Sequence, residues 1–236
     1  MTLSTFGQGF YDIEKNFELI NKGKKKVNVF MGAELVYSKT IDSINRIVIK
    51  NTVQPTKIHA NSYAPKFDDD HSISYREIFF YNSKGTIDST ILINYTSPLV
   101  TIDGGKIPAG VDSTLIVYGK TLLMDKILTR NYYSIKKGAR KLYRTDHYGY
   151  DSNDRLIILI EDDGHTQFYF EYDNDENISA YYVHGVKVSF QYDELGRKSK
   201  DIYVTSTITY EYDDNSLLIK KISSGKNEGV FTYKYE

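Results

Sequence analysis

The sequence lacks cysteine and tryptophan, and it contains only four prolines among its 236 residues. The absence of cysteine excludes disulfide bonds, thiol catalysis and thiolate metal ligands. No apolar run approaches the roughly 20 residues that a membrane-spanning helix needs. Residues 1–10 also lack the basic stretch followed by an apolar stretch that is typical of a signal peptide. We therefore expect no transmembrane segment and no signal peptide in this chain.

Catalytic signatures are absent as well. There is no Gly-x-Ser-x-Gly elbow, no Gly-rich phosphate loop before a helix and no His-Glu-x-x-His helix. Lys24-Lys25-Lys26 is a short basic run without the interleaved aromatic residues that nucleic-acid stacking requires. The sequence therefore predicts a protein that is not an enzyme, uses no cofactor and binds no nucleic acid.

Tyrosine, by contrast, is abundant, with 22 copies, and it recurs in a pattern. An aromatic-x-Tyr-Asp unit returns every 20 to 22 residues in the C-terminal part of the chain. The Tyr-Asp pairs are Tyr150-Asp151, Tyr172-Asp173, Tyr192-Asp193 and Tyr212-Asp213. Such a period indicates stacked copies of one small structural unit.

Each copy predicts a strand, a turn and a second strand. Phe168, Phe170 and Tyr172 alternate with Tyr169 and Glu171, a period of two that places aromatic rings on one face of a strand. The Asp that follows each Tyr can accept a hydrogen bond from the backbone N–H two residues later, which favours a turn. One hairpin alone is marginally stable, so several must share a core.

The copy that runs from Phe190 to Arg197 resembles the YD repeats of the RHS family, in which aromatic-x-Tyr-Asp is followed by Gly, Arg or Asn, and Leu or Ile. Gly196 occupies the glycine position there, whereas Asp154, Glu176 and Ser216 occupy it in the other copies. The resemblance covers mainly residues 143–236, with an outlying copy near residues 79–87 that keeps the glycine and replaces Asp by Asn.

The resemblance implies strand-turn-strand units in a long sheet, which in large toxin complexes closes into a shell around a cargo. It also implies a secreted or surface-associated bacterial protein. This chain is short for such a shell. It also lacks the Asp-Pro-x-x-Gly type of segment that ends such shells, because its prolines, Pro55, Pro65, Pro98 and Pro108, all precede the main array.

The N-terminal part has a different pattern. Phe10, Ile13, Phe17 and Ile20 recur at helical spacing, and Gly23 is placed to end a helix over residues 8–22. Further short strands separated by Gly, Asn and Pro follow it. We predict an all-β protein, an antiparallel meander of stacked β-hairpins with a short N-terminal helix. Residues 1–140 would form one region and residues 141–236 a repeat array continuous with it.

Two tyrosine pairs are candidate ligand-binding residues. Tyr132-Tyr133 and Tyr181-Tyr182 each place a ring on both faces of a strand, so one ring of each pair could stack on sugar or peptide. The other interpretation is a sheet that buries both rings. Asp68, Asp70 and His71 are metal-ligand types, but their spacing matches no defined metal loop, so we predict no metal site.

These observations predict a noncatalytic binding or scaffold protein, secreted or cell-envelope associated in a bacterium, with a protein or glycan partner. Two alternatives stay open. One is a glycan- or peptide-directed hydrolase, which needs converging carboxylates. The other is an immunity or accessory partner of a bacterial toxin system, which rests on the family resemblance alone. The oligomeric state is left open by the sequence.

Overall fold

The structure is a computed structural model that describes residues 19–55, 67, 71–96, 99–100, 106–107, 110–120, 127–136, 139–162, 164–225 and 228–236. The strands are β1 (Lys26–Met31), β2 (Glu34–Asp42), β3 (Ile47–Pro55), β4 (His71–Tyr81), β5 (Ile87–Thr96), β6 (Leu99–Val100), β7 (Lys106–Ile107), β8 (Gly110–Lys120), β9 (Ile127–Lys136), β10 (Ala139–Tyr150), β11 (Leu156–Ile160), β12 (Gln167–Tyr172), β13 (Ile178–Val183), β14 (Val186–Tyr192), β15 (Lys198–Ile202), β16 (Ser206–Tyr212), β17 (Leu218–Gly225) and β18 (Gly229–Tyr235).

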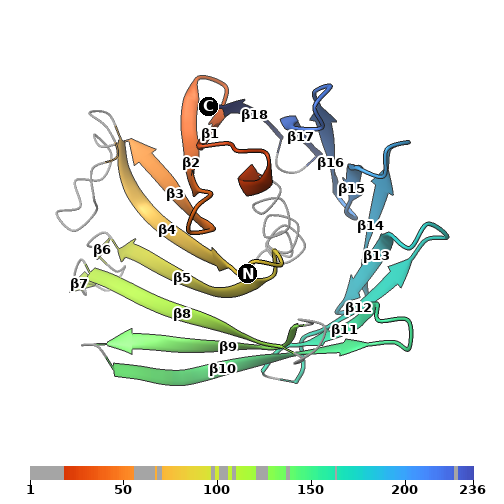
Figure 1. Ribbon diagram of the computed structural model, residues 1–236, viewed down its shortest axis with the longest axis horizontal. Helices are drawn as coiled ribbons and strands as arrows, with labels where there is room; N and C mark the ends of the chain where they lie inside the picture. The colour runs from red at the N-terminus through yellow and green to blue at the C-terminus, as the bar shows by residue number, and fades with distance from the viewer. Residues whose placement is uncertain are drawn as a thin grey trace.

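Sixteen of these strands form a closed antiparallel barrel, and β6 and β7 pair separately (Figure 1). Consecutive strands are neighbours throughout, except that β5 pairs with β8 across the β6–β7 hairpin. The predicted all-β antiparallel meander is therefore confirmed. The ring closes where β1 pairs with β18, from Val27 opposite Tyr235 to Met31 opposite Phe231. Closure leaves the main sheet without an unpaired edge.

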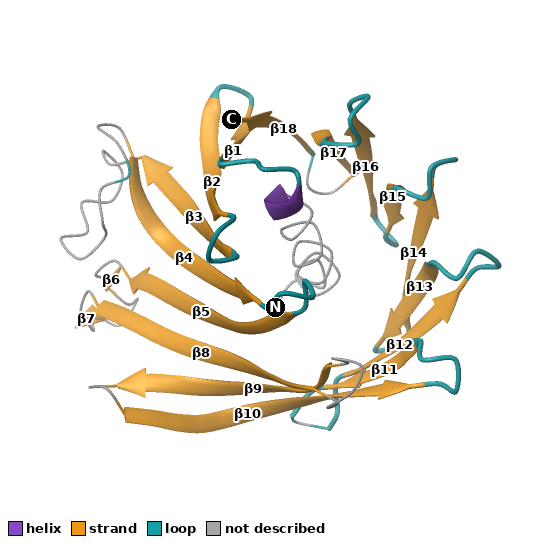
Figure 2. Ribbon diagram, viewed as in Figure 1, coloured by secondary structure: helices purple, strands orange, loops and turns teal. Residues whose placement is uncertain are grey.

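Most of the helix that the sequence predicts over residues 8–22 lies outside the described residues. Its described end is a single helical turn at Leu19–Asn21, inside the ring of strands (Figure 2). Gly23 ends this turn with a φ of 65°, and the N–H of Lys24 donates to the carbonyl of Leu19 at 3.1 Å. This is the Schellman arrangement, in which a left-handed glycine lets the last helical carbonyls find partners.

The inner face of the barrel is mainly apolar and aromatic. Leu19 and Ile20 pack in one buried cluster with wall residues that include Val29, Val48 and Phe79. A second cluster lies under the repeats and contains Leu159, Phe168, Tyr181, Val183 and Val188, all at most 5% exposed. Because side chains alternate across a strand, the residues between these face the outside.

Candidate functional site

The repeat turns are built around the carboxylate that follows each tyrosine. Asp151, Asp173, Asp193 and Asp213 each accept, through Oδ1, hydrogen bonds from the backbone N–H groups two and four residues later, at 2.8–3.0 Å. Asn82 uses its Oδ1 in the same way, at 2.9 and 3.1 Å. The outlying segment near residues 79–87 therefore has the same turn geometry as the main array.

The residue three positions after each Asp has a left-handed backbone. Its φ is 71° at Gly196, but the other turns place Asp154, Glu176 and Ser216 in the same conformation, at 67°, 64° and 59°. A left-handed backbone costs a residue with a Cβ about 1–2 kcal/mol, which glycine avoids. The departures from the glycine pattern thus keep the turn and add local strain.

We expect Glu176→Gly to raise the free energy of unfolding by about 0.5–1 kcal/mol. The strain energy that glycine relieves in the folded state is larger than the extra conformational entropy that glycine loses on folding. Gly196→Ala should lower it by about 1 kcal/mol, since no atom lies within 4 Å of the added Cβ and only the backbone is affected. Urea denaturation of both variants measures these changes. Equal stability of Glu176→Gly and the wild type would contradict the strain argument.

The repeat tyrosines end their strands at equivalent positions. Tyr150, Tyr172, Tyr192, Tyr212 and Tyr235 are the last residues of β10, β12, β14, β16 and β18. Their hydroxyls donate to the carbonyls of Ile127, Leu156, Ile178, Lys198 and Leu218, the first residues of the preceding strands, at 2.6–2.9 Å. A register shift precedes each of the first four rings in its pairing with the next strand. The tyrosines therefore tie each repeat to the one before it.

Two arginines strengthen these ties. Arg155 and Arg197, four residues after their Asp, form ion pairs with Asp151 and Asp193 at 2.8 and 2.7 Å. The same guanidiniums lie 5.0 and 4.7 Å from the ring centres of Tyr172 and Tyr212 in the following repeat. Hydrogen bonds from the backbone N–H of Arg155 hold the pKa of Asp151 below its ordinary value. The YD-like residues are thus engaged in structural contacts.

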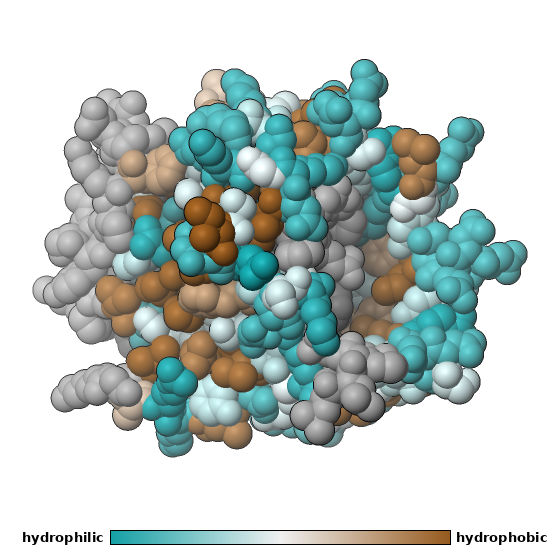
Figure 3. Space-filling view, viewed as in Figure 1, coloured by the Kyte–Doolittle hydropathy of each residue, from teal (hydrophilic) through white to brown (hydrophobic). Residues whose placement is uncertain are grey.

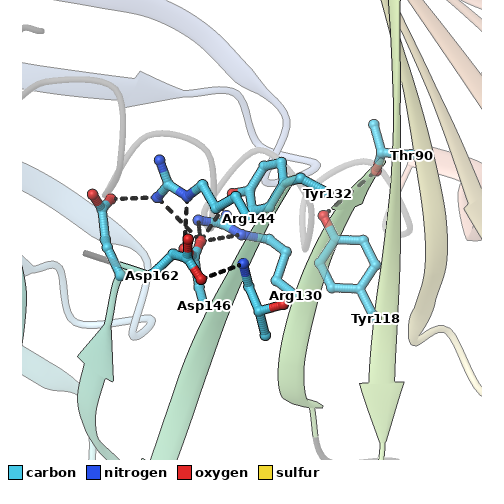
Figure 4. A network of polar contacts seen from close by, with 9 residues as sticks. Thr90, Tyr118, Arg130, Tyr132, Arg144, Asp146 and Asp162 are labelled. Carbon is cyan, nitrogen blue, oxygen red and sulfur yellow. Dashed lines mark hydrogen bonds and ion pairs between the residues drawn. The ribbon is translucent and has the colours of Figure 1, made fainter. Parts of the chain in front are cut away.

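A polar network lies on the inner faces of β9 and β10 (Figure 4). The carboxylate of Asp146 is fully buried and accepts from Arg130 at 2.7 and 3.0 Å, from Arg144 Nε at 2.7 Å, and from the Tyr132 hydroxyl at 3.0 Å. Arg144 also forms an ion pair with Glu161 at 2.8 Å. The positive charges of two guanidiniums and the negative charges of two carboxylates therefore neutralise one another inside the barrel.

Burial by itself raises the pKa of Asp146, but the hydrogen bonds from Arg144 and the charge of Arg130 outweigh it, so the pKa lies below its ordinary value. Burial raises the pKa of Tyr132 and of Tyr148 next to it. The carboxylate is therefore ionised and its oxygens are occupied by donors. A general base must reach a substrate proton, and this arrangement favours a structural role for Asp146 instead.

A second buried charge pair lies under the repeats. The Lys198 ammonium lies 3.1 Å from Asp201 Oδ1, and the hydroxyl of Tyr210 donates to Asp201 Oδ2 at 2.7 Å. The same ammonium is 4.8 Å from the ring centre of Phe190. Sequence reasoning missed both networks. The available signal was charge at alternate positions in otherwise aromatic strands, as in Arg130-x-Tyr132 and Arg144-x-Asp146.

The candidate tyrosine pairs divide between the two faces of the sheet. Tyr181 is 1% exposed and contacts Phe168, Phe170 and Phe190 through tilted ring pairs at 5.8–6.3 Å, so it is closed to any ligand. Tyr132 belongs to the inner network. The adjacent Tyr133 and Tyr182 face outward and are partly exposed, which leaves them as the surface candidates.

Only one of the three weak metal candidates belongs to the described part of the chain. Asp68 and Asp70 lie outside the described residues, and the backbone of His71 begins β4 opposite Pro55. Among the residues that the structure describes, no group of three or more His, Asp or Glu side chains is arranged to hold a metal ion. Within the same residues, no helix has the length and apolar character needed to cross a membrane.

Comparisons with known proteins give distant likenesses only. No family model and no curated protein matches the sequence. Among solved structures, a porin-like protein from Bacteroides uniformis matches with a TM-score of 0.39 and 12% identity, over 90% of this chain and 98% of that one. The complex TcdB2-TccC3-Cdc42 matches at 0.33 and 9% identity, over 81% of this chain and 14% of that one. TcdB2-TccC3 matches at 0.28 and 11%, over 85% and 15%.

Proposed function

We propose that this protein is a noncatalytic binding scaffold, secreted or in the cell envelope of a bacterium, which holds a glycan on the outer face of β12–β14. One observation carries the proposal. Tyr169 and Tyr182 lie directly opposite each other on the outer face of β12 and β13, and Tyr169 is 50% exposed. Neighbouring aromatic rings on one face of a sheet offer an apolar surface that can stack on a sugar ring.

Polar groups surround this apolar surface. Lys187 lies opposite Tyr182 on β14, with its ammonium 5.1 Å from the ring centre, and it forms an exposed ion pair with Glu171 at 3.1 Å. The Tyr169 hydroxyl donates to the side-chain carbonyl of Gln167. Ligand sites commonly combine an apolar surface with a few polar groups that fix orientation. Sugar hydroxyls can exchange hydrogen bonds with these exposed groups.

The inner residues support the noncatalytic part of the proposal. The two buried carboxylates of the inner networks, Asp146 and Asp201, are paired with Arg130, Arg144 and Lys198. Glycoside hydrolysis instead needs two carboxylates that flank a scissile bond. Neither buried network places two carboxylates on either side of a cleft, which supports binding rather than hydrolysis.

A glycan array with the whole chain tests the proposal. We expect the wild type to bind a defined set of glycans, and Tyr169→Thr/Tyr182→Thr to bind them about tenfold more weakly, since about 1.4 kcal/mol of stacking is lost. Threonine keeps the strand preference of the site. The matched control is Ile219→Thr, which changes a 38% exposed apolar residue of β17.

Two outcomes would contradict the proposal. Equal glycan binding by the tyrosine variant and the control would show that Tyr169 and Tyr182 do not bind the glycan. An array without any bound glycan would also contradict the proposed site. Release of shortened sugars from a bound glycan, detected by mass spectrometry, would contradict the noncatalytic assignment.

A further inference from the structure

The outer face of β3, β4, β5, β8 and β9 differs from the rest of the barrel. Its central row is Ile49, Ile78, Ile91, Leu115 and Tyr133, each directly opposite the next across the sheet. These side chains face outward, because the residues beside them, such as Val48, Phe79 and Ile116, pack in the cluster around Leu19 and Ile20. This part of the sheet therefore carries apolar side chains on both faces, although the inner face also holds the Lys50–Glu77 ion pair and Leu115 on the outer face is only 7% exposed.

The neighbouring rows extend this surface, which we term the aliphatic face. The row on one side is Ile47, Phe80, Ser89, Val117 and Asn131, and the row on the other side is Asn51, Arg76, Ile93, Ser113 and Ile135. Ten of the fifteen positions in the three rows are therefore apolar or aromatic. Among the described residues of these three rows, Arg76 is the single charged side chain, and its guanidinium donates to Asn51 Oδ1 at 2.7 Å. Figure 3 shows apolar side chains gathered over β5, β8 and β9 and hydrophilic ones over the repeat turns.

The opposite half of the barrel has a charged exterior. Glu171 pairs with Lys187 at 3.1 Å, and Glu211 pairs with Lys220 at 3.6 Å, on the outer faces of β12 to β17. A barrel embedded in lipid carries an apolar band all round its outside. The aliphatic face covers five neighbouring strands of sixteen, which suits a partner on one side of the molecule.

We propose that the aliphatic face is the interface through which two copies of this chain pair. Five strands about 4.8 Å apart and three rows about 6.7 Å apart cover roughly 500 Å². Two such faces bury roughly 1,000 Å², the lower limit for a specific protein interface, so the dimer is expected to form reversibly with concentration. Two apolar sheet faces pack about 10 Å apart, and a twofold axis brings each central row onto its copy.

Sedimentation equilibrium of the whole chain, up to high micromolar concentration, tests this interface. The wild type should pass from monomer to dimer, and Ile78→Lys should weaken the association at least about tenfold by placing a charge in the desolvated centre. Val230→Lys is the matched control. It changes a 41% exposed β-branched residue on the outer face of β18, and the dimer should be unaffected.

A second variant distinguishes loss of the interface from misfolding of the chain. Ile78→Thr/Ile91→Thr keeps the β-branched side chains that favour strands, and it should weaken the dimer while the far-ultraviolet circular dichroism stays that of the wild type. Tyr169→Thr/Tyr182→Thr should dimerise like the wild type, so the result is independent of the proposed glycan site. A wild type that stays monomeric at every concentration would overturn the proposal, and so would dimers that Ile78→Lys leaves intact. Monomers that float with phosphatidylcholine vesicles would assign the face to lipid instead.

Discussion

Asp146→Asn is expected to lower the free energy of unfolding by about 3 kcal/mol, because it leaves the Arg130 and Arg144 guanidiniums inside the barrel without the carboxylate that neutralises them. The two arginine side chains are 14% and 24% exposed, which places the loss at the lower end of the range for a broken buried ion pair. Urea denaturation followed by tyrosine fluorescence measures the change.

The matched control is Asp214→Asn, which removes a carboxylate from an exposed repeat turn. That change should alter stability by less than about 0.5 kcal/mol. Equal stabilities for the two variants would mean that the Asp146 network contributes nothing to folding.

The stability difference between the wild type and Asp146→Asn should depend on pH. The pKa of Asp146 is lower in the folded protein than in the unfolded chain, so its stabilisation is fully present above the ordinary aspartate pKa of about 3.9 and is lost as the pH falls below that value. The asparagine that replaces it in the variant does not titrate. The difference in unfolding free energy between wild type and Asp146→Asn should therefore be constant near neutral pH and should shrink in acid.

Tyr181→Ala should lower the free energy of unfolding by about 4 kcal/mol, the loss typical of a large aromatic side chain removed from a core. The ring is 1% exposed and packs among Phe168, Phe170 and Phe190. Tyr169→Ala is the control, since it removes the same side chain from a position that is 50% exposed. A loss below about 1 kcal/mol for Tyr181→Ala would show that the cluster under the repeats is not a packed core.

Alkaline titration tests the burial of Tyr181 without a mutation. Burial, and to a lesser extent the charge of Asp201, raise the pKa of Tyr181 to about 12. Because the pKa of Tyr181 is higher in the folded protein than in the unfolded chain, its protonated side chain contributes fully to folding stability below the ordinary tyrosine pKa of about 10. This contribution is lost as the pH rises toward 12. Ultraviolet absorbance should show the exposed tyrosines ionising first, with Tyr181 ionising near the alkaline unfolding transition.

The repeat turns could be predicted because their contacts are local. An Asp carboxylate reaches the N–H groups two and four residues ahead, so the Tyr-Asp spacing alone identifies the hairpins. The resemblance to the YD repeats also identified the segment at residues 79–87, through Asn82 and Gly85. The alternation in β12 also indicated that Phe168 and Phe170 share a face, and both belong to the cluster under the repeats.

The inner networks could be predicted only in part. Alternation places Arg144 and Asp146 on one side of a strand, but Arg130 reaches Asp146 only because β9 and β10 pair in one particular register. That register contains an irregularity between Leu142 and Arg144, which shifts the facing residues by one position. A one-residue shift reverses the face of every following side chain, so sequence spacing across a hairpin does not specify such contacts.

The sequence by itself determined the strand-turn-strand units, their all-β class and the chemistry of each turn, because these depend on residues a few positions apart. The tertiary structure decided that the meander closes. Closure pairs Val27 with Tyr235, from opposite ends of the chain, and depends on twist and register summed over all sixteen strands. It also decided which side of β3, β4, β5 and β8 is inside, because apolar residues alternate onto both faces of these strands and Leu19 and Ile20 pack against only one of them.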